Sequence, residues 1–274
     1  MIWTLLKLVN YDKNVWYWQK GWALLSYEII VLGATFTAAG IAQKYKEKCL
    51  IVERSTQAGY EFLGALNFGT EYTHKPQSDA AKNLLEIFKQ KNAFNGDRIC
   101  LYDCATSFYK LLEGKNVLLN TEIISVDKTD EGFVCTVHSV MGYRTYKAKT
   151  IIDTRVHENM YDTKTYNFSV DGVGDLIKIP NVICEKWGFE HNYILRCSVS
   201  AEFNFIDARK IVSEYIKNLP DGFRLLCLAN DFDYNVKQEY PKYVDGILYM
   251  PSKAYKNPIL AFDAGVVFEN GGEA

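Results

Sequence analysis

The sequence predicts an α/β protein built on a parallel sheet, and two short segments near its start carry that prediction. Residues 27–32 and 49–53 are rich in apolar and β-branched side chains, which is typical of strands buried in a parallel sheet. Residues 38–48, between them, have helical composition with charges in the last turns. Strand, helix and strand in this order form a βαβ unit, in which the two strands lie parallel.

Composition narrows the class of protein. Of the 274 residues, 48% are hydrophobic and 23% are charged, as in ordinary globular proteins. The formal net charge of −2 argues against a nucleic-acid partner, which would need a surplus of Lys and Arg. No apolar stretch is long enough for a membrane span. The seven cysteines contain no Cys-x-x-Cys, so we expect reduced thiols, no metal site and a cytoplasmic protein.

Residues 1–26 are an N-terminal extension that the fold prediction does not use. They are rich in aromatic residues and lack the charged start, apolar block and cleavage site of a signal peptide. Two interpretations stay open. The segment is either the product of a misassigned start codon or a genuine helix or dimerisation arm.

The turn after the first strand carries a phosphate-binding pattern. Gly33-x-Thr35-x-x-Ala38 lies between strand and helix, and Glu53 ends the second strand. Gly33 permits the sharp turn, and the amides at the helix N-terminus attract a pyrophosphate. A carboxylate at the position of Glu53 accepts hydrogen bonds from ribose hydroxyls. The pattern predicts a dinucleotide site. The alternative is a βαβ unit that binds nothing, because Thr35 and Ala38 replace two glycines.

The rest of the chain predicts a meander and then a second, β-rich region. The expected order is two helices (80–91 and 103–113), a buried strand (117–119), a three-stranded meander (122–128, 132–140 and 143–149) and a further buried strand (150–153). The later sequence is less periodic. Its expected elements are strands 182–187, 193–200, 225–229 and 246–250, helix 206–218, and a helix-like tail after Asn257-Pro258.

Several of these segments resemble one enzyme family. Residues 28–35, residues 50–54 and Gly59 are similar to the start of FAD-dependent oxidoreductases with a glutathione-reductase type of FAD domain. The meander and the return strand that ends at Thr154 follow in the family's order. Residues 257–265 are similar to the C-terminal segment whose acid contacts the ribityl–phosphate part of FAD. The resemblance is specific near the start of the chain and loose elsewhere.

The resemblance implies a fold, a cofactor and a set of site residues. It implies a Rossmann-like FAD-binding domain at residues 27–155 and 245–274, with a smaller β-rich substrate or cap domain inserted at residues 156–244. FAD is the implied cofactor. The implied cofactor-binding residues are Gly33, Ala34, Thr35, Phe36, Thr37, Ala38, Glu53, Arg54, Gly59, Ile123 (through its backbone, at the adenine), Thr154 and Asp263.

The chain departs from the family at two places. Arg155 puts a long cation where the family has the glycine of Ala-Thr-Gly, and only residues 266–274 remain for the rest of the final helix. No acid–base constellation stands out, so catalytic residues stay unassigned. His157 is a candidate because it follows the return strand, on the side where ligands bind in open α/β sheets. Residues 231–233, Asp-x-Asp, are interpreted as a solvated acidic turn rather than a cation site.

These observations favour a soluble FAD-dependent oxidoreductase acting on an unidentified small molecule. Two alternatives stay open. One is a noncatalytic flavin-fold protein that serves for binding or as a scaffold, and the other is an NAD(P)-linked reductase without flavin. Glu53 would serve either nucleotide, whereas the return strand and Asp263, through the resemblance, favour FAD. Self-association into a homo-oligomer is also left open.

Overall fold

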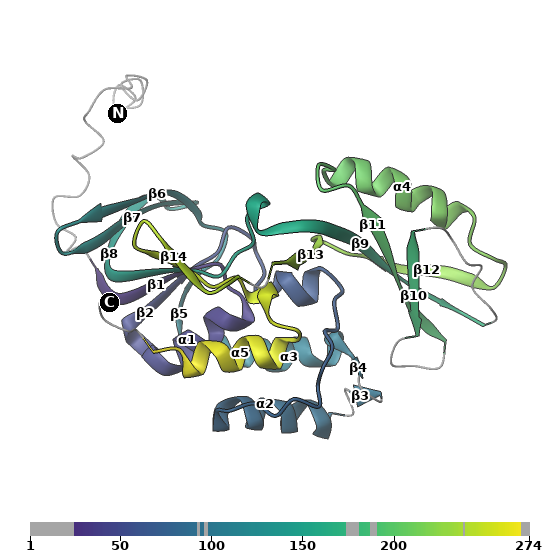
Figure 1. Cartoon of the computed structure of the whole chain (residues 1–274), viewed down its shortest axis with the longest axis horizontal. Helices are drawn as coiled ribbons and strands as arrows, with labels where there is room; N and C mark the ends of the chain where they lie inside the picture. The colour runs from purple at the N-terminus through teal and green to yellow at the C-terminus, as the bar shows by residue number, and fades with distance from the viewer. Residues whose placement is uncertain are drawn as a thin grey trace, which may run out of the picture.

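The computed structural model describes residues 25–91, 94–95, 98–173, 181–186, 191–237 and 239–269. These residues form two large sheets, which lie beside each other along the length of the molecule (Figure 1). The expected extension at residues 1–26 falls almost entirely outside the described part. No helix in the described ranges is both long and apolar enough to cross a bilayer.

The first sheet is mixed and has a parallel centre. Its order is β14-β15-β8-β1-β2-β5, with β6 and β7 continuing from β8. β1 lies parallel to both β2 and β8, so the carboxyl ends of these three strands meet at one edge. The strands are β1 (Ser26–Leu32), β2 (Cys49–Val52), β5 (Asn116–Leu118), β6 (Glu122–Thr129), β7 (Gly132–Ser139), β8 (Gly142–Asp153), β14 (Lys242–Val244) and β15 (Ile247–Tyr249). The predicted parallel α/β architecture is confirmed.

One strand, β8, replaces the two that the sequence predicts at 143–149 and 150–153. Its first part pairs with β7 and its last part pairs with β1, and the two ladders overlap at Lys147 and Ala148. No glycine or proline interrupts the chain there, so the strand continues from the meander into the parallel sheet. This continuity carries Asp153 and Thr154 to the edge where β1 and β2 end.

Four helices pack on the side of the first sheet away from the meander (Figure 1). They are α1 (Phe36–Tyr45), α2 (Asp79–Gln90), α3 (Leu101–Leu112) and α5 (Pro258–Val267). The connections contain short helical turns η2 (Lys46–Lys48), η3 (Tyr60–Gly64), η4 (Glu158–Met160) and η5 (Ser252–Ala254), and a small hairpin of β3 (Phe94–Asn95) and β4 (Arg98–Ile99). The core between sheet and helices includes Ile29, Val31, Phe36 and Phe108, which have no exposed surface.

The second sheet is antiparallel and lies between β8 and β14 in the chain, as expected for an inserted β-rich region. Its order is β10-β11-β9-β12, and β13 also pairs with β9. The elements are β9 (Tyr161–Gly172), β10 (Val182–Lys186), β11 (Asn192–Val199), β12 (Phe223–Leu228), β13 (Asp233–Val236) and the covering helix α4 (Phe205–Lys217). The domain limits at 156 and 244 stay a prediction.

The sequence did not predict β9, the central strand of the second sheet. Tyr166, Phe168 and Val170 alternate with Asn167 and Ser169, and all five side chains are buried. A polar residue at every second buried position hides the apolar run that usually marks a strand buried on both faces. Nδ2 of Asn167 donates to the carbonyl of Ala65 at 2.8 Å, a residue that is distant in the sequence.

Candidate functional site

The turn between β1 and α1 has the shape that the sequence predicts. Gly33 has a φ of +95°, a conformation that side chains disfavour, and its amide donates to the carbonyl of Val52 on β2. Thr35 caps α1, because its Oγ1 accepts from the amide of Ala38 at 3.1 Å. The amide of Gly59 donates to the carbonyl of Ala34 at 2.7 Å. The turn therefore gathers Gly33–Ala38 and Gly59 into one group.

Glu53 also joins this group. Its Oε2 accepts from the amide of Ala34 at 2.9 Å, and its Oε1 accepts from the amide of Ser55 at 2.8 Å. The side chain is half-buried, and Arg54 beside it is exposed. The carboxylate thus stands at the tip of β2 facing the turn, where a ribose-binding acid is expected.

A second carboxylate, which the sequence analysis missed, lies at the start of α1. Glu61 is 8% exposed, and its Oε1 accepts from the amide of Phe36 at 2.8 Å. The same oxygen accepts from the hydroxyl of Ser252 at 2.8 Å, and Ser252 Oγ accepts from the amide of Thr37 at 3.4 Å. The available signal was an acid within the otherwise apolar run 59–63 that follows β2.

Burial dominates the electrostatics of Glu61. It raises the pKa of this carboxyl to about 7, although the Phe36 amide, the Ser252 hydroxyl and the charge of Lys253 act in the opposite direction. Glu61 Oε2 has no hydrogen-bond partner, and neither has the buried hydroxyl of Thr37. The start of α1 therefore holds an anionic group whose polar atoms are only partly satisfied.

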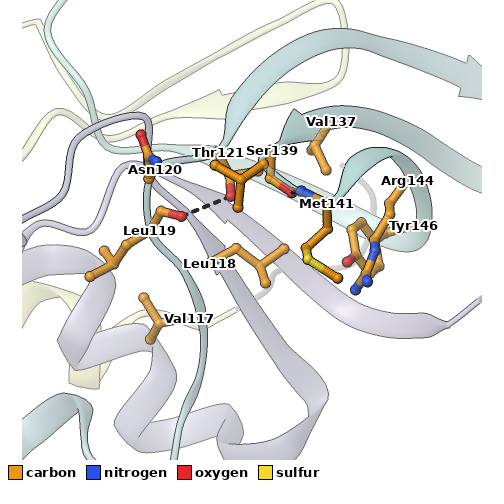
Figure 2. A pocket seen from close by; sticks show the side chains of 11 residues that line it. Val117, Leu118, Leu119, Asn120, Thr121, Val137, Ser139, Met141, Arg144 and Tyr146 are labelled. Atoms are coloured by element: carbon orange, nitrogen blue, oxygen red, sulfur yellow. Dashed lines mark hydrogen bonds between the residues drawn. The ribbon is translucent and has the colours of Figure 1, made fainter.

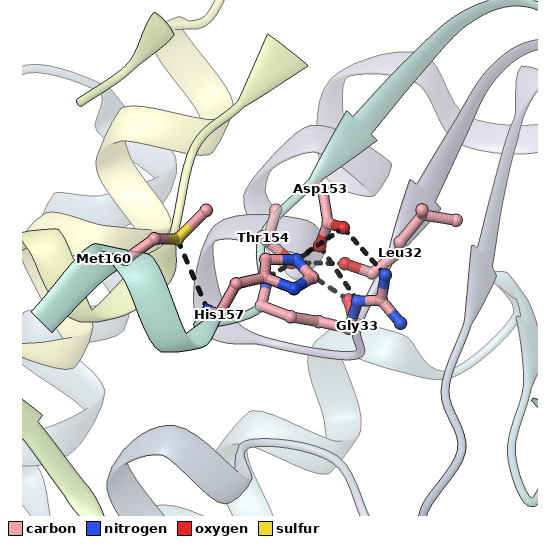
Figure 3. Close-up of polar contacts among 7 residues, drawn as sticks. Leu32, Gly33, Asp153, Thr154, His157 and Met160 are labelled. Carbon is pink, nitrogen blue, oxygen red and sulfur yellow. Dashed lines mark hydrogen bonds and ion pairs between the residues drawn. The ribbon is translucent and has the colours of Figure 1, made fainter. Parts of the chain in front are cut away.

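Asp153, at the end of β8, bonds to two side chains that follow it in the chain, those of Arg155 and His157 (Figure 3). Arg155 Nη2 and Nε donate to its two oxygens at 2.7 and 2.9 Å, and His157 Nε2 lies 2.9 Å from Oδ2. Burial acts to raise the pKa of Asp153, but the hydrogen bonds from Arg155 and His157 outweigh it and hold the pKa below its usual value. The His157 ring keeps 39% of its surface exposed and meets Tyr249 edge to face.

Arg155 covers the β1–α1 turn. A Cβ added to Gly33 would lie 2.7 Å from Arg155 Cγ, so the aliphatic part of the arginine rests on the glycine. Thr154 bonds to the same turn, donating through Oγ1 to the carbonyl of Leu32 at 3.0 Å and lying 2.9 Å from Thr35 Oγ1. The arginine that stands at position 155, where the resembling family has glycine, therefore fills the space above Gly33.

Asp263 and Ile123 have their observed contacts outside the β1–α1 turn, and their roles in cofactor binding stay predictions. Asp263 accepts from the amides of Gln77 and Ser78, at 2.6 and 2.8 Å, and so ties α5 to the N-terminus of α2. Ile123 pairs with Val137 in the meander, and its half-buried side chain packs against the cluster that contains Ile30. The ring of Phe36 stacks on that of Phe108 with centroids 3.9 Å apart, so only the backbone amide of Phe36 faces the predicted phosphate position.

A cavity of about 250 Å³ lies on the meander side of the first sheet (Figure 2). It is bounded by β5, the segment after it and the β7–β8 hairpin. Its lining residues are Val117, Leu118, Leu119, Asn120, Thr121, Val137, Ser139, Val140, Met141, Arg144 and Tyr146. None of the predicted cofactor residues is among them, although the lining residues Leu118 and Thr121 bond to the backbone of Glu53 at 2.8 and 2.9 Å.

The prediction of a solvated acidic turn at residues 231–233 is wrong. Asp233 is 8% exposed, lies 2.7 Å from Lys253 Nζ and accepts from Asn67 Nδ2 at 2.7 Å. Burial raises the pKa of the neighbouring Asp231 to about 6. Both partners of Asp233 come from distant parts of the sequence, so the local pattern could not indicate them.

Comparison with known proteins agrees with the fold and leaves the subfamily undetermined. No protein-family model matches the chain, and no curated protein matches it. Among solved structures, p-nitrophenol 4-monooxygenase PnpA from Pseudomonas putida DLL-E4 is similar with a TM-score of 0.56 and 12% identity, over 89% of this chain and 78% of that one. Glycine oxidase from Geobacillus kaustophilus is similar with a TM-score of 0.55 and 10% identity, over 89% and 93%.

The match to a third solved structure covers a smaller share of that protein's chain. OxyS anhydrotetracycline hydroxylase from Streptomyces rimosus has a TM-score of 0.50 and 9% identity, over 88% of this chain and 60% of that one. Identities this low concern the fold and leave substrate and reaction open. The described part of the chain therefore has the mixed α/β fold of these solved structures, with an antiparallel sheet inserted between β8 and β14.

Proposed function

We propose that this chain is an FAD-dependent oxidoreductase acting on a small molecule. The observation that carries the proposal is the acceptor bound at the start of α1. The amide of Phe36 donates to the carboxyl group of Glu61 there, and Glu53 faces the same turn from the tip of β2. A helix N-terminus that donates to an acceptor oxygen, beside an acid placed to bind ribose, is the arrangement that binds a dinucleotide in this fold.

The donor set at this turn fits a phosphate group. The Phe36 amide, the unpartnered hydroxyl of Thr37 and the hydroxyl of Ser252 are hydrogen-bond donors at or beside the first turn of α1. The dipole of the helix adds partial positive charge at that end. Two groups now fill the space, the Glu61 carboxylate and the side chain of Arg155, and both have to turn aside when a nucleotide enters.

Each residue of the turn has a role in this proposal. Glu53 would hold the adenosine ribose, and the start of α1 would hold the pyrophosphate. Thr154 keeps the return strand bonded to the turn. FAD, when bound, would supply the redox chemistry, so the protein has to bind, orient and shield it. His157, which Asp153 orients, is the exposed imidazole available for proton transfer on this side of the sheet.

Absorbance of the purified protein tests the proposal. The spectrum is recorded before and after incubation with excess FAD and desalting. Flavin bands at about 370 and about 450 nm should survive desalting in the unmodified protein and be lost in Glu53→Ala, which removes the ribose acceptor. Glu47→Ala, at an exposed residue after α1, is the control and should retain flavin. A flat spectrum from folded, FAD-treated protein would overturn the proposal.

A noncatalytic flavin-fold protein is the second candidate, and the filled turn favours it. Arg155 rests on Gly33, and Glu61 bonds the amide that a phosphate would use. Arg155→Gly separates the two candidates. In an FAD enzyme this substitution clears the turn and increases the flavin retained after desalting. In a scaffold protein neither the unmodified chain nor Arg155→Gly retains flavin. Binding of NADPH or NADH without flavin would instead indicate the NAD(P)-linked reductase.

A further inference from the structure

Glu61 reaches the start of α1 from a separate segment of the chain. It lies on the single turn η3, which follows Gly59 in the connection between β2 and α2. Its Oε1 is held from two directions, by the amide of Phe36 and by the hydroxyl of Ser252, each at 2.8 Å. The segment before α2 and the segment before α5 therefore meet at the first turn of α1.

The carboxylate occupies the position of a bound anion. A helix N-terminus favours negative charge, and carboxylate and phosphate oxygens accept the same N–H donors. The neighbouring amides are also satisfied internally, Thr37 N by Ser252 Oγ and Ala38 N by Thr35 Oγ1. The side chains of Ala34 to Ala38 are at most 6% exposed. An external phosphate cannot reach these donors while Glu61 stays in place.

The contact is incompletely satisfied, as expected of a group that a better ligand can replace. Glu61 Oε2 and the hydroxyl of Thr37 are both buried without a hydrogen-bond partner. The nearby ammonium of Lys253 is 2.7 Å from Asp233 rather than bonded to Glu61. Burying unpaired polar atoms costs free energy, and a phosphate with more acceptor oxygens could use the Thr37 hydroxyl that Glu61 leaves unpaired.

The Glu61 segment lies between two glycines. It begins at Gly59, which has a φ of +76°, and ends at Gly64. Gly59 N donates to the carbonyl of Ala34 at 2.7 Å, and the carbonyl of Gly64 accepts from the amides of Asn230 and Asp231 at 2.7 and 3.3 Å. Phe62, inside the segment, is fully buried. A ligand that displaces Glu61 together with this segment therefore has to break these contacts, and hydrogen exchange of the backbone amides reports that change.

We propose that Glu61 is an internal occupant of the α1 anion site, and that the cofactor binds by displacing Glu61 and moving residues 59–64. The identity of that cofactor as FAD rests on the function proposed above. The contact of Glu61 with α1 then inhibits ligand binding from within the chain, and the affinity for the ligand depends on the free energy needed to displace this carboxylate.

Two measurements test this at pH 8, where Glu61 is charged. The first is the Kd for FAD, from fluorescence titration of the unmodified protein, Glu61→Gln, Glu61→Ala and the exposed control Glu71→Gln. Loss of the competing carboxylate should lower the Kd of both Glu61 variants by about tenfold or more, and the control should not change. The second is hydrogen–deuterium exchange of the unmodified protein, in which FAD should speed exchange at residues 59–66.

The outcomes separate this inference from the proposed function. Equal FAD affinity in all four proteins, with unchanged exchange at 59–66, overturns the role of Glu61 and leaves FAD binding intact. FAD binding by Glu61→Ala alone supports the Glu61 contact, whereas the failure of the unmodified chain to bind FAD overturns the proposed function. If no protein binds FAD, inorganic pyrophosphate is the probe. Tighter pyrophosphate binding by folded Glu61→Ala supports the contact and overturns FAD as cofactor, and equal binding overturns both.

Discussion

At the scale of single residues, the buried carboxyl group of Glu61 makes the stability of the protein depend on pH. Burial raises its pKa to about 7, against an ordinary value of 4.5, because Phe36, Ser252 and Lys253 offset only part of the lost hydration. The folded protein therefore binds a proton on Glu61 more tightly than the unfolded chain does. Stability from this group is fully present below pH 4.5 and is lost as the pH rises through about 7.

We predict that Glu61→Gln flattens the dependence of stability on pH. Glu61 should cost the unmodified protein about 3 kcal/mol between mildly acidic pH and pH 8, and the neutral glutamine should remove that cost. Urea denaturation at pH 5 and pH 8 measures it, with Glu71→Gln as the control. Burial also raises the pKa of Asp231, which therefore adds to the pH dependence of every variant. The effect of Glu61 is the difference in pH dependence between Glu61→Gln and the unmodified protein. Parallel profiles for the two proteins would contradict the prediction.

At the scale of elements, the crossing of α1 and α5 fixes where the start of α1 lies. The two helices touch through glycines. A Cβ on Gly40 would lie 2.1 Å from the carbonyl oxygen of Phe262, and one on Gly265 would lie 2.1 Å from that of Thr37. This approach is closer than any side chain permits, so the first turn of α1 is positioned by direct backbone contact with α5.

We predict that Gly40→Ala and Gly265→Ala each destabilise the fold. An alanine in a helix is usually worth about 1 kcal/mol over glycine, but overpacking against a backbone carbonyl should outweigh this and leave a net loss of about 2 kcal/mol. Chemical denaturation gives the loss. Gln43→Ala, at an exposed position of α1, is the control and should be nearly neutral. A gain in stability for both glycine variants would show that the helices can separate freely.

At the scale of the whole molecule, one buried ion pair joins the two sheets. Lys253 belongs to η5, which follows the first sheet, and Asp233 belongs to β13 of the second. Their side chains are only 6% and 10% exposed, and Lys253 Nζ also lies 4.8 Å from the centre of the Phe62 ring. In so little water an unpaired charge is costly, so each partner depends on the other.

We predict that Lys253→Ala lowers the free energy of unfolding by about 3–5 kcal/mol, because it leaves Asp233 charged and buried. The double variant Lys253→Met with Asp233→Leu should recover most of the loss, since it removes both charges. The exposed pair Lys237–Asp162, at 3.0 Å, is the matched control, and Lys237→Ala should cost less than about 1 kcal/mol. If Lys253→Ala costs no more than Lys237→Ala, the pair does not hold the sheets together.

Local patterns predicted much of the first sheet and its turn. Apolar, β-branched runs indicated β1 and β2, and Gly33 indicated a turn that needs a positive φ. Glu53 lies beside the turn because a parallel pair of strands puts both carboxyl ends at one edge. Such features depend on residues close in the sequence, so a single chain reveals them without its three-dimensional structure.

The occupants of the site were decided by tertiary structure alone. Glu61 lies 25 residues from Phe36, and Ser252 lies 215 residues from Thr37, yet these side chains satisfy the first turn of α1. Asp263 accepts from the amide of Ser78 at the start of α2, 185 residues away in the chain. Contacts of this kind depend on how helices and sheets pack, so the spacing of residues in the sequence does not predict them. By itself, the sequence determined the shape of the turn, and the packed fold determined which groups fill it.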